Sequence, residues 1–269
     1  MTAGRAHRLD AAVAERAGVT RSQARSLIME GRVRVDGAIA TKAGMNAKPS
    51  AVIEVAGPRP FVSRGGEKLD AALDAFGVDA AGVEALDVGA STGGFTDCLL
   101  QRGAASVTAV DVGYGQLDWR LRNDPRVRVM ERVNFRLLDD AAFPGGFDVI
   151  VVDASFISVR ILALRARTYL RPNGAIVALV KPQFEAGRER VGGGGVVRDA
   201  GVHREVLRDV RDALQQGGLI AVALVASPLR GPAGNLEFFV ELRVAGQAIA
   251  DARIDEVVAG AHTAMAGDR

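Results

Sequence analysis

From residue 83 onward, short apolar segments alternate with segments of helical character, and this alternation limits the fold more than any other feature. Residues 147–153 have the length and the β-branched content of a buried strand, whereas 202–216 repeats its apolar residues at helical spacing. Strands that alternate with helices pair in parallel within a doubly wound sheet. The expected strands cover residues 83–88, 106–112, 127–130, 147–153, 175–180, 220–226 and 236–243.

Helices are expected between these strands, over 95–102, 158–169 and 202–216. Only a loop separates the last two strands, so we expect an antiparallel hairpin at one edge of the sheet. The sequence therefore predicts an α/β fold with a Rossmann-like, seven-stranded, mostly parallel sheet.

The first 57 residues have a different texture. Two short helices are predicted over 8–17 and 20–30, followed by a hairpin with its turn at Asp36-Gly37 and a further strand over 51–55. Gly57-Pro-Arg-Pro60 is then a stiff break in the chain. We expect a small α+β domain over 1–57, a linker over 58–63 and a larger domain over 64–269.

Charge is distributed unevenly between these two parts. Residues 1–60 contain ten Lys and Arg against five Asp and Glu, whereas the remainder contains 24 against 27. A basic segment on a mildly acidic body indicates a polyanionic partner for the first domain. The alternative is that these charges form a solvated face without a partner.

Composition excludes several other classes of protein. Hydrophobic residues make up 48% of the chain, enough to bury a sizeable core. The single cysteine, Cys98, excludes an intramolecular disulfide, and the three histidines are too scattered to suggest a metal site. No apolar run approaches the roughly 20 residues that span a bilayer, and the start lacks a signal-peptide core. We expect a cytoplasmic monomer that uses no metal and binds no membrane.

A glycine-rich turn is the strongest local signal. Leu86-Asp-Val-Gly-Ala-Ser-Thr-Gly-Gly-Phe95 passes from a buried strand through a turn into a helix. Small residues let a ligand approach the backbone amides and the positive end of the helix. The spacing fits neither the dinucleotide-binding pattern nor the P-loop, although a nucleotide such as NAD and a purely structural turn remain alternatives. The expected cofactor-binding residues are Asp87, Gly89, Ser91, Gly93, Gly94, Phe95, Asp111, which ends the next strand, and Asn134.

Charged residues mark the ends of the expected strands. Asp153 ends the fourth strand, Lys181 ends the fifth, Glu237 opens the seventh, and Lys68 lies shortly before the first. Open α/β sheets bind ligands outside the carboxyl ends of their strands, so these side chains are expected to converge there. Any one of them could be a surface ion. Two lysines beside two carboxylates, however, leave no uncompensated charge in a dry site.

These motifs resemble known families. The turn preceded by Asp87 and followed by Asp111 is similar to the S-adenosylmethionine site of class I methyltransferases, and the Lys–Asp–Lys–Glu order resembles the tetrad of FtsJ-like ribose 2′-O-methyltransferases. The N-terminal part resembles an S4 RNA-binding domain, through Arg8-Leu-Asp10, Thr20-Arg-Ser22 and Gly31-Arg-Val-Arg-Val-Asp-Gly37. Nearly the whole chain resembles the TlyA family, most densely over 61–68, 87–95, 111–125, 148–158 and 180–187.

The resemblance implies a reaction and a substrate. Lys68, Asp153, Lys181 and Glu237 would be catalytic, with Lys181 stabilising the developing alkoxide or accepting its proton. S-adenosylmethionine would donate the methyl group without a metal, and cytidine ribose in the RNA of ribosomal subunits would accept it. The residues expected to contact RNA are Arg8, Arg21, Arg25, Arg32, Arg34, Arg64 and Arg188.

Two other functions are weighed against methyl transfer to RNA. A degenerate methyltransferase fold could serve as a non-catalytic RNA-binding or ribosome-assembly factor, although the turn and all four charged positions are intact. A membrane-active haemolysin, a name that this family has sometimes carried, is disfavoured because the sequence shows no spanning run and no strongly amphipathic apolar helix. The loop with Arg188 and Gly192–Gly195 is expected to be either an RNA-gripping lid or a disordered connection.

Overall fold

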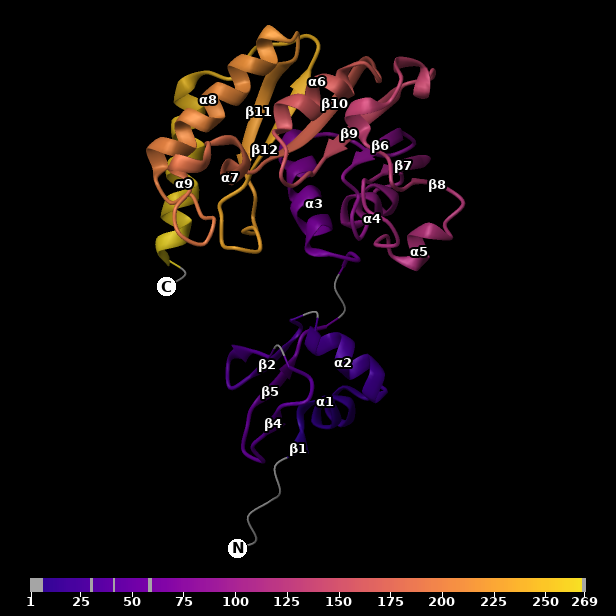
Figure 1. Ribbon diagram of the computed structural model, residues 1–269, viewed down its shortest axis with the longest axis vertical. Helices are drawn as coiled ribbons and strands as arrows, with labels where there is room; N and C mark the ends of the chain where they lie inside the picture. The colour runs from indigo at the N-terminus through magenta and orange to yellow at the C-terminus, as the bar shows by residue number, and fades with distance from the viewer. Residues whose placement is uncertain (1–6, 30, 41, 58–59, 268–269) are drawn as a thin grey trace, which may run out of the picture. The chain divides into compact units, whose positions relative to one another are not determined.

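The computed structural model describes residues 7–29, 31–40, 42–57 and 60–267, and the chain divides into two compact units, Met1–Arg59 and Pro60–Arg269 (Figure 1). Each unit has a hydrophobic core of its own. The division falls within the expected linker, of which residues 58 and 59 lie outside the described part of the chain.

The first unit is a small α+β domain. Its helices and strands are β1 (His7–Arg8), α1 (Leu9–Ala17), α2 (Arg21–Met29), β2 (Val33–Val35), β3 (Ala38–Ile39), β4 (Asn46–Ala47) and β5 (Ile53–Val55). Strands β3, β2 and β5 form an antiparallel sheet, and β1 pairs with β4. Asp36 and Gly37 both have positive φ, 50° and 80°, as a two-residue hairpin turn requires. The apolar faces of α1 and α2 bury Leu9, Val13, Ala24 and Ile28 against this sheet.

The second unit contains a seven-stranded sheet in the order β11-β12-β10-β9-β6-β7-β8. The strands are β6 (Glu84–Val88), β7 (Ser106–Val110), β8 (Val127–Met130), β9 (Phe147–Val152), β10 (Leu170–Val180), β11 (Ile220–Ala226) and β12 (Phe238–Arg243). Neighbours from β10 to β8 are parallel, whereas β12 runs antiparallel to both β10 and β11. The expected mostly parallel sheet with an antiparallel hairpin at one edge is confirmed.

Helices cover both faces of this sheet, which explains why its strands are apolar throughout (Figure 1). The helices are α3 (Arg64–Phe76), α4 (Gly94–Gln101), α5 (Trp119–Arg122), α6 (Val159–Arg167), α7 (Pro182–Glu185), α8 (Ala200–Gln216) and α9 (Asp251–Gly267). On β9, Ile150 and Val152 face the core formed with α6, α8 and α9, whereas Val149 and Val151 face the core formed with α3 and α4. The buried thiol of Cys98 belongs to the second of these cores, and burial raises its pKa to about 12.

Helix α3 has no counterpart among the expected elements, because its first turn contains Gly65 and Gly66, which disfavour helix. Ser63 caps the helix by accepting a hydrogen bond from the backbone N–H of Gly65 at 3.3 Å. A Cβ atom at position 66 would lie 2.3 Å from Cγ of Phe61, so the glycine lets the preceding chain cross the helix. Lys68 lies on the buried side of α3 together with Gly66 and Leu69.

Among the residues that the structure describes, none of the helices combines the length and the apolarity needed to cross a membrane.

Candidate active site

The glycine-rich turn joins the end of β6 to the start of α4. Gly89 has φ of +90°, and a Cβ atom there would lie 2.2 Å from the carbonyl oxygen of Asp153. The turn therefore passes directly over the end of β9, in a conformation that favours glycine. The backbone N–H of Gly89 donates to the carbonyl of Val110 at 2.9 Å, which holds the turn against β7.

Asp87 lies fully buried beneath this turn. Its Oδ2 accepts a hydrogen bond from the hydroxyl of Thr96 at 2.7 Å, whereas its Oδ1 is buried without a partner among the described residues. Burial raises the pKa of this carboxyl to about 7, against the opposing effect of the Thr96 hydrogen bond. An unpartnered buried acceptor fits a site that receives a cationic or hydrogen-bonding group from a ligand.

A cavity of about 380 Å³ opens beside the turn, within the size range of small-molecule sites. Of the expected cofactor-binding residues, it is lined by Gly89, Ser91, Asp111 and Asn134, and Asp153 also reaches it. The carboxylate of Asp111 accepts from the backbone N–H groups of Ser91 at 2.7 Å and Gly113 at 2.6 Å, which fixes it at the cavity wall. The side chain of Asn134 also caps a short 3₁₀ helix by accepting from the backbone N–H of Arg136 at 3.2 Å.

Phe95 and Gly94 are in packing contacts and do not line the cavity. The ring of Phe95 is 3% exposed, and its centroid lies 6.0 Å from that of Phe239 in the core beneath the sheet. A Cβ atom on Gly94 would lie 2.2 Å from Oγ of Ser63, so this glycine permits close approach of α3 to α4. Gly93 likewise contacts core leucines and does not line the cavity. The helix start is thus shaped by packing. Asp87 and these three residues do not line the cavity, and their assignment to the cofactor stays a prediction.

Two lysine–carboxylate pairs lie where strands β9 and β10 end and β12 begins. Nζ of Lys68 is 2.5 Å from Oε2 of Glu237, with side chains that are 9% and 1% exposed. Nζ of Lys181 is 2.5 Å from Oδ1 of Asp153 and also donates to the hydroxyl of Ser155 at 3.2 Å. The second pair is more accessible than the first, so the two pairs differ in how readily they meet a substrate.

Strand register explains why these residues share an edge. Val180 is the last residue of β10 and lies opposite Phe238, the first residue of the antiparallel strand β12. Lys181 therefore follows one strand where Glu237 precedes its neighbour. Asp153 directly follows β9, on the other side of β10. The backbone positions of Asp153, Lys181 and Glu237 therefore lie at the same end of three neighbouring strands, as the sequence predicts.

The segment that follows Asp153 is bound to helix α7, which follows Lys181. Phe156, which is 90% exposed with φ of +65°, lies at the cavity rim with its ring centroid 5.1 Å from that of Phe184. Glu185 accepts hydrogen bonds from the hydroxyl of Ser158 and the backbone N–H of Val159, both at 2.7 Å. Burial raises the pKa of Glu185. A phenylalanine three residues after a strand-end aspartate was the available signal for this feature, and sequence reasoning assigned Phe156 no role.

The loop after α7 has a defined structure. Gly192 and Val196 form an isolated antiparallel bridge, and the buried side chain of Asn235 donates to the carbonyl of Gly195 and accepts from the backbone N–H of Val197, both at 2.9 Å. The expectation of a disordered connection is wrong, because Asn235 fastens the loop to the segment that leads into Glu237. Arg188 lies on the exposed side of this loop.

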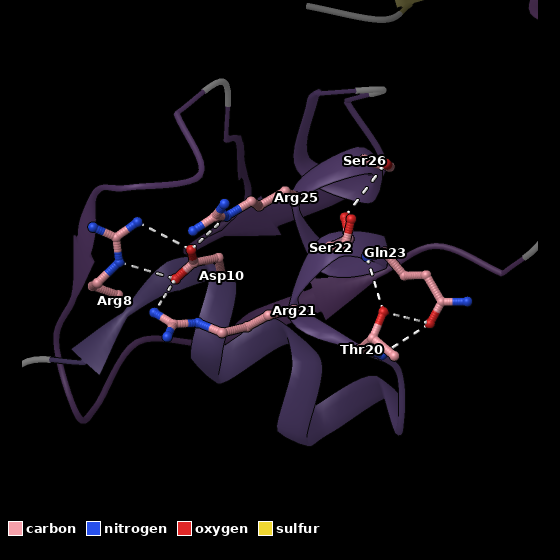
Figure 2. Close-up of polar contacts among 8 residues, drawn as sticks. All are labelled: Arg8, Asp10, Thr20, Arg21, Ser22, Gln23, Arg25 and Ser26. Atoms are coloured by element: carbon pink, nitrogen blue, oxygen red, sulfur yellow. Dashed lines mark hydrogen bonds and ion pairs between the residues drawn. The ribbon is translucent and has the colours of Figure 1, made fainter.

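The arginines expected to contact RNA fall into separate groups. Arg8, Arg21 and Arg25 converge on Asp10 within the first unit (Figure 2). The others make backbone contacts or lie exposed: Arg32 donates to the carbonyls of Ala56 and Gly57, Arg34 to that of Gly37 and Arg64 to that of Arg230, while Arg188 is exposed.

Comparisons with known proteins agree with this geometry. The FtsJ-like methyltransferase family matches residues 61–244, and the S4 domain matches residues 7–53. The 16S/23S rRNA (cytidine-2′-O)-methyltransferase TlyA of Mycobacterium tuberculosis is 47% identical over 240 residues, which cover 88% of this chain and 89% of the relative. Hemolysin A of Brachyspira hyodysenteriae is 40% identical over 220 residues, covering 81% and 92%.

A solved structure shares the architecture of the whole chain. It is that of a Streptococcus thermophilus protein named as a hemolysin, with a TM-score of 0.78 and 39% sequence identity over 98% of each chain. The relatives named as methyltransferases and those named as hemolysins thus match the same chain over most of its length. This chain, with its N-terminal S4 domain and its catalytic fold, belongs to the FtsJ-like methyltransferases of the TlyA family.

Proposed function

We propose that this chain transfers a methyl group from S-adenosylmethionine to the 2′-hydroxyl of a ribose, that of a cytidine, in ribosomal RNA. The observation that carries the proposal is that two lysine–carboxylate pairs occur where β9 and β10 end and β12 begins, and that Asp153 of one pair lines the cavity beside the glycine-rich turn. The name of the Mycobacterium tuberculosis relative supports the choice of base and of RNA.

The residues that line the cavity, together with Asp87 buried beneath the glycine-rich turn, fit S-adenosylmethionine. This cofactor supplies an electrophilic methyl group on a sulfonium. Asp87 has a buried Oδ1 without a partner among the described residues, which suits the amino group of the methionine part. Asp111 lies at the carboxyl end of the neighbouring strand, the position from which a carboxylate binds a ribose diol in α/β sheets. The described residues contain no cluster of three or more potential metal ligands.

Lys181 and Asp153 would act on the attacking hydroxyl. A ribose hydroxyl is a poor nucleophile near neutral pH and loses its proton as it attacks. Lys181, held by Asp153 at 2.5 Å, would donate to this oxygen and stabilise its developing negative charge, or would accept its proton when the amine is neutral. Asp153 also reaches the cavity, so the pair connects the cofactor site to the substrate.

Lys68 and Glu237 would orient the hydroxyl and Lys181 rather than exchange protons with the substrate. Their pair is almost completely buried, and each charge there is compensated by the other. The buried Lys68–Glu237 pair would keep Lys181 and the hydroxyl aligned, and alignment of the reacting groups contributes much of the rate in two-substrate reactions.

Phe156 and Arg188 would position the RNA at the mouth of the site. A nucleotide must leave its stack to present its ribose to an enclosed site, and an unstacked base binds well against an aromatic ring. The exposed ring of Phe156 lies at the rim of the cavity, and Phe156 follows Asp153 by three residues in the chain. Arg188 lies on the loop after α7, which the hydrogen bonds of Asn235 hold in place, and offers a contact to phosphate.

We assign recruitment to residues 1–57 and chemistry to 64–269, connected by the linker 58–63. Phosphate contacts of an S4 domain recruit and orient the RNA without reading its sequence. A monomer in the cytoplasm would carry out the reaction on ribosomal subunits.

The test is methyl transfer from labelled S-adenosylmethionine to purified small and large ribosomal subunits, with Lys181→Ala as the control. We expect label on ribose of at least one subunit with the wild-type protein and none with the variant. Cofactor binding without transfer to either subunit would favour the non-catalytic RNA-binding function. Label on a base would contradict the proposed position.

A further inference from the structure

Asp10 lies at the centre of an arginine cluster in the S4 domain (Figure 2). Its fully buried carboxylate accepts from Nε and Nη2 of Arg8 at 3.2 and 3.0 Å. Arg21 and Arg25, one turn apart on α2, donate to it at 3.1 and 3.0 Å. These four residues, here called the Asp10 cluster, join β1, the first turn of α1 and α2.

The Asp10 cluster presents positive charge to solvent and keeps its negative charge inside. The arginine side chains are 49%, 54% and 55% exposed, whereas that of Asp10 is 0% exposed. The hydrogen bonds from Arg8 hold the pKa of Asp10 well below its ordinary value, so the carboxylate stays ionised. Three positive charges around one negative charge leave a net charge of +2.

The arrangement overcomes two costs of building such a site. Guanidinium groups held close together repel each other, and each free arginine side chain loses rotamer entropy when it is fixed. Asp10 offsets the repulsion and fixes the side chains before any ligand arrives. A guanidinium also carries more N–H donors than the carboxylate uses, so donors remain for a second acceptor.

We propose that the Asp10 cluster is a phosphate-binding site and that Asp10 is its positioning residue, holding three guanidinium groups in place for the RNA backbone. This inference rests on the proposed function, because it takes RNA as the partner of the S4 domain. If only the net charge mattered, loss of the Asp10 carboxylate would strengthen RNA binding, whereas a positioning role predicts weaker binding. Removing a carboxylate raises the net charge of the domain and should strengthen its attraction to phosphate.

The test compares Asp10→Asn with Asp36→Asn in the full chain. Both variants remove one negative charge from the S4 domain, and Asp36 accepts only from the backbone N–H of Val52 among its described contacts, at the hairpin turn. Affinity for purified 16S ribosomal RNA is measured against salt concentration. We expect Asp10→Asn to bind about tenfold more weakly, with a salt slope lower by roughly one phosphate contact, and Asp36→Asn to bind at least as tightly as wild type. Equal affinity of the two variants would overturn the inference.

A second pair of variants does not depend on the folding of Asp10→Asn. Arg25→Lys keeps the charge of Arg25 but not its planar set of donors, whereas Arg25→Gln loses both. An organised site predicts that both variants bind RNA about fivefold more weakly. A diffuse positive surface predicts that Arg25→Lys binds like wild type, and this result would contradict a role for Asp10 in positioning.

Failure of the inference can be distinguished from failure of the proposed function. Phosphates are common to all RNA, so 16S RNA binding by wild type without methyl transfer to any subunit would contradict the proposed reaction and leave the Asp10 comparison valid. Methyl transfer by wild type, together with unchanged RNA affinity of Asp10→Asn and Arg25→Lys, would contradict the inference alone. Absence of RNA binding by wild type would contradict both.

Discussion

Nζ of Lys181 lies 2.5 Å from Oδ1 of Asp153, although the two residues follow different strands. Only the parallel alignment of β9 and β10 brings them together. Lys181 also contacts the hydroxyl of Ser155, so its ammonium is held from the side of the cavity.

Lys181→Ala tests the assignment of this pair. Loss of a group that stabilises or deprotonates the attacking oxygen lowers the rate by about 10² to 10⁴-fold. We expect methyl transfer to fall by that factor while the dissociation constant for S-adenosylmethionine, measured by calorimetry, changes little. Turnover close to that of wild type would remove Lys181 from the mechanism.

The Lys68–Glu237 pair predicts an effect on stability. Glu237→Ala leaves the ammonium of Lys68 buried without its counter-charge, at a cost of roughly 3–5 kcal/mol in the free energy of unfolding. The double variant Lys68→Met with Glu237→Met should recover most of this loss in urea unfolding but not the activity. Arg120→Ala breaks an exposed pair with Asp118 and serves as the control, with an expected effect below about 1 kcal/mol. Recovery of activity in the double variant would leave this pair a purely structural role.

Asp87 predicts a pH dependence of cofactor binding. Burial raises its pKa to about 7, so the carboxyl is mostly neutral at pH 5.5 and half ionised at pH 7. If it holds an amino group, affinity for S-adenosylhomocysteine should rise about tenfold across this range, below the pH at which α-amino groups ordinarily lose their proton. Asp87→Asn should bind weakly at both values. An unchanged pH dependence in this variant would assign the titration to another group.

The same pKa predicts how stability changes with pH. The folded protein binds a proton at Asp87 more tightly than the unfolded chain, because the folded-state pKa lies above the ordinary value. The contribution of Asp87 to stability is therefore present at low pH and is lost as pH rises through about 7. Asp87→Asn should lack this contribution to the pH profile of thermal unfolding. A difference profile between variant and wild type that is flat from pH 4 to pH 8 would contradict the raised pKa.

Phe156 predicts a separation between activity and stability. Its ring is 90% exposed, so Phe156→Gly removes little buried area, and glycine accommodates the positive φ without strain. We expect the thermal midpoint to stay within a few degrees of wild type while kcat/KM for ribosomal subunits falls at least tenfold. Phe184→Leu is the companion variant, because it removes the partner ring but leaves Phe156 in place. Full activity of Phe156→Gly would exclude a stacking role.

The sheet and the charged residues at its strand ends were predictable, because each apolar strand and the charged residue that ends it are adjacent in the sequence. An apolar run that stops at Asp153 or Lys181 fixes the place of that side chain within the sheet without knowledge of its neighbours. The carboxylate of Asp87 was recognisable for the same reason, since it directly precedes the turn.

Features that depend on packing between distant segments were not predictable. Helix α3 escaped prediction because the glycines in its first turn are poor helix formers, and only the crossing of Phe61 explains Gly66. Phe95 follows the turn in sequence, but the rotation of α4 directs its ring toward Phe239. The partners of Asp10 lie 2, 11 and 15 residues away, spacings that no local pattern relates.

The ion pair between Lys68 and Glu237 also has a consequence for synthesis of the protein. It joins residues 169 positions apart, so Lys68 waits for its counter-charge until nearly the whole catalytic domain has left the ribosome. The S4 domain emerges before the catalytic domain, and the hydrophobic core of the S4 domain is built from its own residues. A nascent chain can therefore complete its RNA-binding domain before its catalytic domain, whereas the Lys68–Glu237 pair forms only after Glu237 has emerged.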